Sequence, residues 1–145
     1  MAMLKRVDHL NVQVPPDKED EAKYFYGEIL GLPTLTKPDN LGRSGAHYRL
    51  SEEPWYELHL GIARGTSVED IGLNQALRNH LGFQVDDLAA SRRAFEAAGI
   101  AIDEADPARS EERDFYQERF FVRDPGGNQL EIMEPRRPHS ARPKA

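Results

Sequence analysis

An internal repeat is the feature of this sequence that most limits how the chain can fold. The segment from Asp8 to Val14 aligns without gaps with the segment from Asn79 to Val85, and the second residue of each is a histidine. The segment from Tyr56 to Leu60 aligns with Leu130 to Glu134, and the second residue of each is a glutamate. The two histidines are 71 residues apart and the two glutamates 74, a difference that loop length explains. The chain is therefore expected to contain two copies of one structural unit.

The residue pattern of the first half predicts five elements in the order strand, helix, strand, strand, strand. Residues 7–14 alternate apolar and polar, as a half-buried strand does. Residues 17–30 have the apolar spacing of a helix, with Asp17 as its expected cap and Gly31 as its end. Strands are expected at residues 34–37, 46–50 and 56–62, with a polar turn at 51–54. Residues 63–78 are interpreted as a linker with a helical turn near 74–77.

The second half repeats this order. A strand is expected at residues 80–85, then a helix that Asp87 caps and Gly99 ends, and a short extended segment at 100–103. Residues 104–118 are polar and loop-like, and strands at 119–123 and 129–134 are joined by Asp-Pro-Gly-Gly-Asn at 124–128, a strong turn signal. The predicted fold class is α+β. One domain covers residues 1–134, with modules at 5–62 and 79–134 and the linker between them.

Charge separates the last residues from the rest of the chain. Residues 135–145 hold four basic residues and no acidic one; since the whole chain has a net charge of −6, the remainder carries −10. The tail is rich in proline and poor in apolar residues, which predicts disorder, and the acidic body argues against nucleic acid as a partner. Cysteine is absent, which excludes disulfides and thiolate ligands. No segment has the pattern of a signal peptide or a membrane span, so a cytoplasmic location with no membrane partner is predicted.

The repeat places four metal-ligand side chains in equivalent positions. His9 and His80 lie on the first expected strand of each half, and Glu57 and Glu131 lie on the last. If these faces line a common cup, two imidazoles and two carboxylates converge, a donor set that suits Zn²⁺, Ni²⁺, Co²⁺, Mn²⁺ or Fe²⁺. His59 follows Glu57 by two residues and shares its face, so it competes as a ligand. The alternative is that each histidine is structural and each glutamate is solvated.

Four motifs carry a resemblance to a known family. They are Asp8-His9-Leu10, Phe25-Tyr26 followed by Leu30-Gly31, His80 followed by Val85-Asp86-Asp87, and the run from Phe121 to Glu131. Over residues 5–135 the chain resembles the vicinal oxygen chelate superfamily, which includes glyoxalase I, bleomycin resistance proteins and extradiol dioxygenases; the subfamily is not assigned. The resemblance implies two βαβββ modules curled into an incomplete barrel around a metal cup, ligands at the four positions above, and a homodimer.

The resemblance also implies a chemistry. A divalent metal in such a cup binds neighbouring substrate oxygens as a Lewis acid, and a carboxylate of the site, Glu131 or Glu57, acts as general base. The favoured function is a glyoxalase-like lyase or isomerase that acts on a small oxygen-rich substrate. The first alternative is a metal-free protein that sequesters a drug-like molecule, although such members usually lack the four ligands. The second is an Fe(II) dioxygenase, which is less favoured because Phe121 replaces the expected tyrosine and no histidine lies between His80 and His139.

Cationic and aromatic residues of the middle strands and loops are expected to bind the substrate. The residues proposed are His47, Arg49, Tyr56, Tyr116 and Arg119, with Tyr48 and Trp55 as further candidates. This set suits a small carboxylated or phenolic substrate. The alternative is that these side chains are ordinary surface residues.

Overall fold

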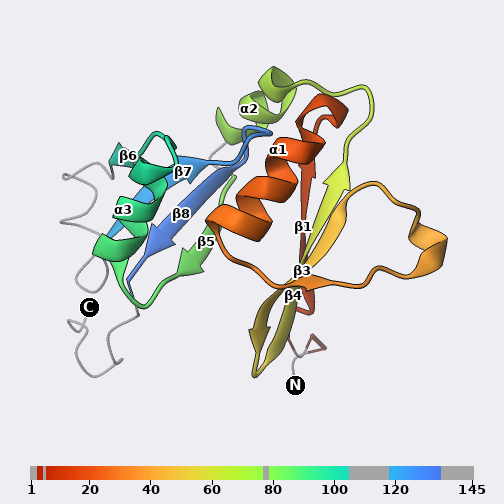
Figure 1. The fold of residues 1–145 in the computed structure, drawn as a ribbon, viewed down its shortest axis with the longest axis horizontal. Helices are drawn as coiled ribbons and strands as arrows, with labels where there is room; N and C mark the ends of the chain where they lie inside the picture. The colour runs from red at the N-terminus through yellow and green to blue at the C-terminus, as the bar shows by residue number, and fades with distance from the viewer. Residues whose placement is uncertain (1–2, 5, 77–78, 105–117, 135–145) are drawn as a thin grey trace. The chain divides into compact units, whose positions relative to one another are not determined.

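The chain forms two compact units, each with its own four-stranded sheet. The structure is a computed structural model that describes residues 3–4, 6–76, 79–104 and 118–134, with side chains from 73 to 76 left aside. The first unit comprises Met1–Asn74 and Pro125–Asn128, and the second comprises Gln75–Asp124 and Gln129–Ala145. The α+β class and the repeated unit are both confirmed, because each unit pairs a sheet with a helix (Figure 1).

The sheet of the first unit has the strand order β1-β4-β3-β2. β1 (His9–Val14) runs parallel to β4 (Trp55–Ile62), β4 is antiparallel to β3 (Ala46–Glu52), and β3 is antiparallel to β2 (Thr34–Leu35). A helical segment crosses between β1 and β2 and lies over one face of this sheet (Figure 1). The order strand, helix, strand, strand, strand is the one that the sequence predicts.

The core of the first unit lies between this helical segment and one face of the sheet. Phe25 and Tyr26 are fully buried, as are Val14 and Leu58. The ring of Tyr26 lies 6.1 Å from that of the buried Tyr48 on β3. Successive strand residues point to opposite faces, so the odd-numbered residues of β3 and β4 near these positions face away from the core. That second face carries the histidines described below.

The crossing segment is less regular than the predicted helix. It begins with a 3₁₀ turn, η1 (Pro16–Lys18), continues as α1 (Glu19–Tyr24), and ends in a π-helical turn, η2 (Phe25–Ile29). Asp17 is not the cap that the sequence predicted; Pro15 occupies that position, and its neighbour Pro16 starts the turn. Asp17 therefore lies inside the first turn, where a negative charge is favoured. A further 3₁₀ turn, η3 (Asp39–Leu41), precedes β3.

The predicted linker contains a helix that the sequence interpretation underestimated. α2 spans Val68–Ala76, whereas only a helical turn near residues 74–77 was expected. Its start is a capping box, in which the backbone N–H of Asp70 donates to Ser67 Oγ at 3.1 Å while the N–H and hydroxyl of Ser67 donate to Asp70 Oδ2 at 2.8 Å. The Ser-x-x-Asp pattern at this point was the sequence signal that could have predicted the helix.

The sheet of the second unit has the strand order β5-β8-β7-β6. Its elements are β5 (Leu81–Gln84), α3 (Leu88–Ala97), β6 (Asp103–Glu104), β7 (Arg119–Arg123) and β8 (Gln129–Met133). The predicted cap and stop of α3 are confirmed, since Asp87 Oδ1 accepts from the N–H of Ala90 at 2.8 Å and Gly99 has a φ of 73°. Buried Phe95 on α3 meets Phe120 on β7 edge to face, with ring centroids 6.0 Å apart. The predicted loop at 105–117 and tail at 135–145 lie outside the described residues.

The turn between β7 and β8 packs against residues of the first unit. Asn128 Nδ2 donates to the backbone carbonyl of Gln13 at 2.8 Å. A Cβ on Gly126 would lie 2.4 Å from Val14 Cγ1 and 3.1 Å from Val14 Cα. Only glycine allows this approach, because those distances are below any ordinary carbon–carbon contact. The Asp-Pro-Gly-Gly-Asn sequence therefore supplies close packing as well as a turn.

No helix among the described residues is long and apolar enough to cross a membrane.

Candidate metal centre

The predicted site residues of the first unit gather on the sheet face that points away from its core. On this face β1 contributes His9, β4 contributes Glu57 and His59, and β3 contributes His47 and Arg49. The strand pairing places His9 beside Glu57, His47 beside His59, and Arg49 beside Glu57. Three neighbouring strands therefore bring these side chains together, although His9 and His47 are 38 residues apart in the sequence.

Three imidazole rings form a stacked row across these strands. The rings of His47 and His59 are nearly parallel, with centroids 3.7 Å apart and 5° between their planes. The ring of His9 stacks on His59 with centroids 4.3 Å apart and 15° between the planes. His9 Nδ1 also lies 2.9 Å from Asp8 Oδ2. His59 is thus the central ring of the row.

The carboxylate of Glu57 lies at one side of this row. Its Oε2 is 2.8 Å from His59 Nε2, and its Oε1 accepts a hydrogen bond of 2.8 Å from the indole N–H of Trp55. The hydrogen bonds with His59 and then with Trp55 lower the pKa of Glu57, so this carboxyl is ionised at neutral pH. Burial, together with the neighbouring His59, lowers the pKa of His47 and keeps its imidazole neutral. A carboxylate and a neutral imidazole are the forms that bind metals.

His47, Glu57 and His59 together form a candidate metal centre. Each offers a ligand atom within 4.8 Å of those of the other two, and this is the one such group among the residues that the structure describes. Two imidazoles and one carboxylate suit borderline divalent ions, because nitrogen donors favour Zn²⁺, Fe²⁺, Co²⁺ and Ni²⁺ over hard cations. The sequence analysis had proposed His47 as a substrate contact and His59 as a rival of Glu57. The structure groups all three.

The second unit holds a histidine and a glutamate in direct contact. His80 Nε2 lies 3.0 Å from Glu131 Oε2, and Arg119 forms an ion pair with Glu131, in which Arg119 Nε and Glu131 Oε1 are 2.7 Å apart. The side chains of Arg119 and Glu131 are only 10% and 14% exposed, so this pair is screened little by solvent. The sequence analysis had proposed Arg119 for substrate binding; in the structure its guanidinium holds Glu131. His80 and Glu131 belong to one unit and His9 and Glu57 to the other, so the four-ligand set stays a prediction.

The strand registers of the two units revise the alignment of their closing strands. Leu10 pairs with Leu58 in the first sheet, and its equivalent Leu81 pairs with Leu130 in the second. Position for position, Glu131 therefore corresponds to His59 and not to Glu57. The sequence alignment differs by two residues because a strand shifted by two keeps the same apolar faces, so hydrophobic pattern alone does not fix this register.

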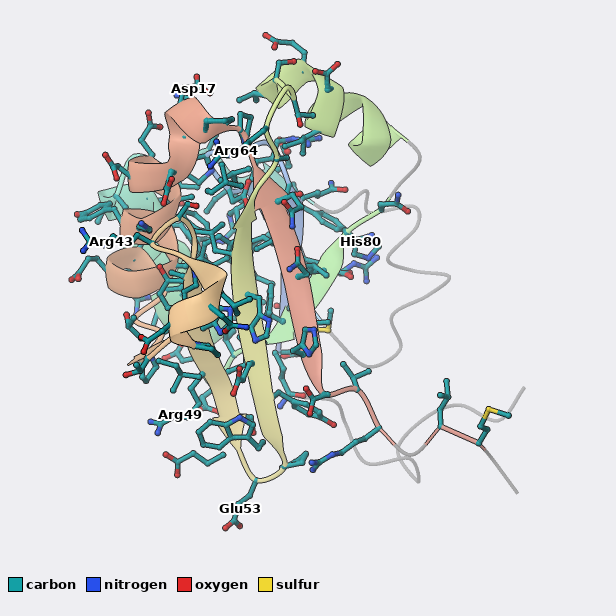
Figure 2. All side chains as sticks on the ribbon, turned by 90° about the vertical axis from the view of Figure 1, so that its right-hand side faces the viewer. Asp17, Arg43, Arg49, Glu53, Arg64 and His80 are labelled. Atoms are coloured by element: carbon teal, nitrogen blue, oxygen red, sulfur yellow. The ribbon has the colours of Figure 1, made fainter. Side chains whose placement is uncertain are left out.

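The other predicted substrate residues are spread over different surroundings. Arg49 pairs with Glu52 at 2.8 Å toward the tip of the β3–β4 hairpin, where Glu53 also lies (Figure 2). Tyr56 alternates with Glu57 along β4 and so lies on the other side of the strand from the candidate metal centre. Tyr48 is buried on the core side. Tyr116 lies outside the described residues.

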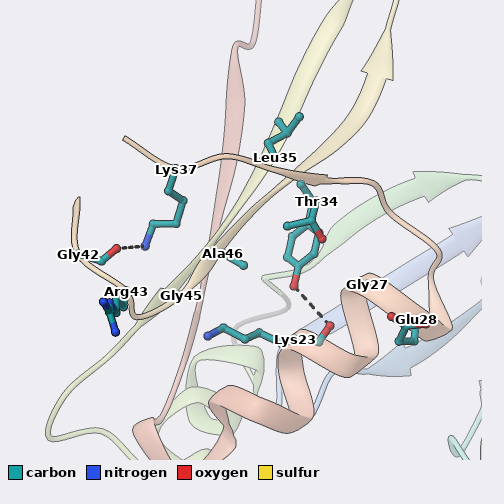
Figure 3. A pocket seen from close by; sticks show the side chains of 11 residues that line it. Lys23, Gly27, Glu28, Thr34, Leu35, Lys37, Gly42, Arg43, Gly45 and Ala46 are labelled. Atoms are coloured by element: carbon teal, nitrogen blue, oxygen red, sulfur yellow. Dashed lines mark hydrogen bonds between the residues drawn. The ribbon is translucent and has the colours of Figure 1, made fainter. Parts of the chain in front are cut away.

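A cavity of about 450 Å³ lies on the helix side of the first sheet, away from the histidines (Figure 3). Its lining includes Lys23, Lys37, Arg43 and the ring of Tyr48, whose hydroxyl donates to the carbonyl of Lys23 at 3.4 Å. Lys37 Nζ is held by the carbonyls of Gly42 and Ser44, and Lys23 pairs with Glu19 at 2.7 Å. The sequence analysis missed this cavity because these residues come from separate segments and form no local pattern.

A comparison of the sequence with protein-family models agrees with the fold and the motifs described above. Residues 6–132 match the model described as the Glyoxalase/Bleomycin resistance protein/Dioxygenase superfamily, and the chain belongs to this superfamily. The resemblance that the motifs predicted is thereby confirmed, with the subfamily still unassigned. No curated protein sequence gives a match.

Several solved structures are similar over nearly the whole chain. A glyoxalase family protein from Bacillus anthracis has a TM-score of 0.73 and 26% identity, covering 94% of this chain and 99% of that one. A glyoxalase/dioxygenase from Nostoc punctiforme has a TM-score of 0.69 and 21% identity, covering 93% and 94%. TnmS3, an antibiotic binding protein from Streptomyces sp. CB03234, has a TM-score of 0.63 and 18% identity, covering 93% and 99%. The last two likenesses concern the fold alone.

Proposed function

We propose that the protein is a metal-dependent enzyme, a glyoxalase-like lyase or isomerase that acts on a small oxygen-rich substrate. The observation that carries the proposal is that each unit brings a histidine at or next to the start of its first strand close to a glutamate of its last strand, although the two pairs occupy different register positions. His9 pairs in register with Glu57, and His80 lies 3.0 Å from Glu131. These four residues would hold a divalent ion, which supplies Lewis-acid stabilisation of substrate oxygens when bound.

The first histidine has a partner of the kind that metal ligands use. Asp8 Oδ2 lies 2.9 Å from Nδ1 of His9. A ring that donates from Nδ1 to a carboxylate is fixed in the tautomer whose Nε2 carries the lone pair, and such carboxylate–histidine pairs raise the basicity of the ligand. This contact supports His9 as a ligand.

The two glutamates are suited to different roles. Hydrogen bonds from His59 and Trp55 lower the pKa of Glu57, which makes it a weaker proton acceptor and favours a role as ligand. Glu131 is the proposed general base, and Arg119, whose Nε lies 2.7 Å from Glu131 Oε1, orients the carboxylate. His47 and Arg49, on the same face as Glu57, are the proposed substrate contacts.

Elemental analysis tests the metal, and a reaction screen tests the enzyme. Protein purified without chelator is expected to contain about one Zn, Ni, Co, Mn or Fe per chain, and the His9→Ala/His80→Ala variant is expected to have lost the ion that the four-ligand set holds while keeping its circular dichroism spectrum. The metal-loaded protein would then be screened with hemithioacetals and afterwards catechols, with Glu131→Gln as the inactive control. A wild type that stays metal-free after reconstitution would reject the proposal.

A second candidate is a metal-free protein that sequesters an aromatic, drug-like molecule. The ion pairs of Glu131 with Arg119 and His80 favour it, because they already neutralise a carboxylate that the metal would otherwise bind. TnmS3, an antibiotic binding protein, has this fold. If the wild type is metal-free, calorimetric titration with aromatic antibiotics is the next experiment.

The proposal includes a cytoplasmic homodimer, as is frequent for paired modules of this superfamily. Light scattering at micromolar concentration is expected to give twice the mass of the 145-residue chain. A monomer would exclude every version in which two chains share one site.

A further inference from the structure

We infer that the first unit binds a divalent transition-metal ion through His47, Glu57 and His59, without His80 or Glu131 of the second unit. This inference goes beyond the proposed function, with which it shares Glu57 as a ligand and His47, which was proposed there as a substrate contact. Two of the three ligands, His47 and His59, lie outside the four-ligand set. The site is carried by β3 and β4 alone.

The position of the three side chains in the sheet supports this site. His47 and His59 are directly opposite each other on antiparallel strands, and Glu57 is the next residue on the same face of β4. Their ligand atoms lie within 4.8 Å of one another. Binding requires the two imidazoles to turn from their parallel stack until their nitrogens converge on the ion. Both sit on the non-core side of the sheet, so this rotation displaces no core residue.

A partner outside the three ligands holds the carboxylate in place. The indole N–H of Trp55 donates to Glu57 Oε1, while Glu57 Oε2 faces His59. Hydrogen bonds of this kind orient ligands and are part of most metal sites. On the other side of His59, the ring of His9 stacks at 4.3 Å and limits the directions in which His59 can turn.

The repeat shows that this cluster is particular to the first unit. By strand register, the residues of the second unit equivalent to Glu57, His59 and His47 are Gln129, Glu131 and Phe121. Only Glu131 among these is a good metal ligand. The three-residue centre is therefore not one half of a repeated site.

The donor set defines the class of ion. Two imidazoles and one carboxylate leave open coordination positions on a borderline divalent ion, as in catalytic zinc sites and in non-haem iron sites. Because Glu57 is required by both sites, an ion held here and an ion in the four-ligand set compete for one carboxylate.

Trp55 provides a direct readout, since it is the only tryptophan of the chain and touches Glu57. The experiment is a titration of the full-length, chelator-treated protein with Co²⁺. Binding is measured by the quenching of tryptophan fluorescence and by the visible absorption of bound Co²⁺. Two double variants are compared, His47→Ala/His59→Ala and, as the matched control in the second unit, His80→Ala/Glu131→Gln. Circular dichroism establishes that each variant is folded, and Glu57→Gln is a third variant that preserves side-chain shape.

The inference expects His47→Ala/His59→Ala and Glu57→Gln to bind Co²⁺ more than about 100-fold more weakly, because loss of even an outer partner costs about 10–100-fold. The control variant is expected to bind one Co²⁺ as the wild type does. Co²⁺ retained by His47→Ala/His59→Ala but lost from the control would overturn the inference and leave the proposed function standing. Equal loss from both double variants, or no binding by the wild type, would also overturn it.

Discussion

At the scale of single residues, the indole of Trp55 has more influence than its position suggests. Trp55 is 40% exposed at the start of β4, yet its indole N–H donates to Glu57, the carboxylate that both proposed metal sites need. A donor at 2.8 Å stabilises the ionised form, which is one of the two leading causes of the lowered pKa of Glu57. Trp55 therefore acts together with His59 to stabilise the ionised form of Glu57.

The substitution Trp55→Phe should raise the pKa of Glu57, because it removes a hydrogen bond that stabilises the ionised carboxylate more than the neutral carboxyl. Carbon-13 NMR of the Glu57 carboxyl across a pH series measures this, and metal affinity at neutral pH should fall by about 10–100-fold. Tyr56→Phe is the matched control, since the neighbouring side chain lies on the other side of β4. An unchanged pKa in Trp55→Phe would show that His59 alone holds the carboxylate.

Residue types were easier to predict than residue pairs. His9 and His80 could be selected because they occupy equivalent positions of the repeat, whereas Glu57 and Glu131 were paired by an alignment that differs from the strand register by two residues. The link of His47 to His59 could not be predicted, since it depends on which residue of β3 lies opposite which residue of β4. A shift of two in that register leaves every apolar side chain on the same face, so sequence pattern does not distinguish the possibilities.

At the scale of elements, the sequence predicted the strands well but not the starts of the first two helical segments, which depend on local capping. Both strands of each hairpin and the cap of α3 were predicted, because alternation and an aspartate before an apolar stripe are strong signals. The length of α2 was underestimated because its glycine and short apolar stripe give little helical periodicity. Its Ser-x-x-Asp capping box was the stronger sequence signal. Asp17 is not the cap because the prolines before it start the helical segment two residues earlier than the sequence pattern indicates.

Loss of the capping box should destabilise α2. Ser67→Ala removes the hydroxyl that accepts from the N–H of Asp70 and is expected to lower the free energy of unfolding by about 1 kcal/mol. Urea denaturation followed by circular dichroism measures the change. Ser67→Thr keeps the hydroxyl and should recover most of the loss; equal destabilisation by both variants would mean that packing, and not capping, is responsible.

At the scale of the whole molecule, the turn after β7 is the place where the division into sequence repeats differs from the division into structural units. The strands on either side of it belong to the second unit, but Pro125–Asn128 belong to the first. The sequence repeat suggested two consecutive modules, and no local pattern could indicate that four residues of the later half pack with the earlier one.

The close approach at this turn predicts a large effect from one methyl group. Gly126→Ala would place a Cβ 2.4 Å from a side-chain carbon of Val14, and overpacking of this kind costs about 1–3 kcal/mol. Gly72→Ala is the control, because a Cβ there meets nothing within 4 Å and alanine in a helix should gain about 0.5–1 kcal/mol. Thermal unfolding of both variants provides the comparison, and similar midpoints for the two would argue against the contact.

The chain passes between the two units three times: after Asn74, after Asp124 and after Asn128. A single cut in the linker therefore does not yield two self-sufficient halves. A fragment that ends at residue 74 lacks the amide that binds the carbonyl of Gln13 and the glycine backbone that covers Val14. The first unit therefore includes four residues that come late in the sequence, and the boundary between the two sequence repeats is not the boundary between the two units.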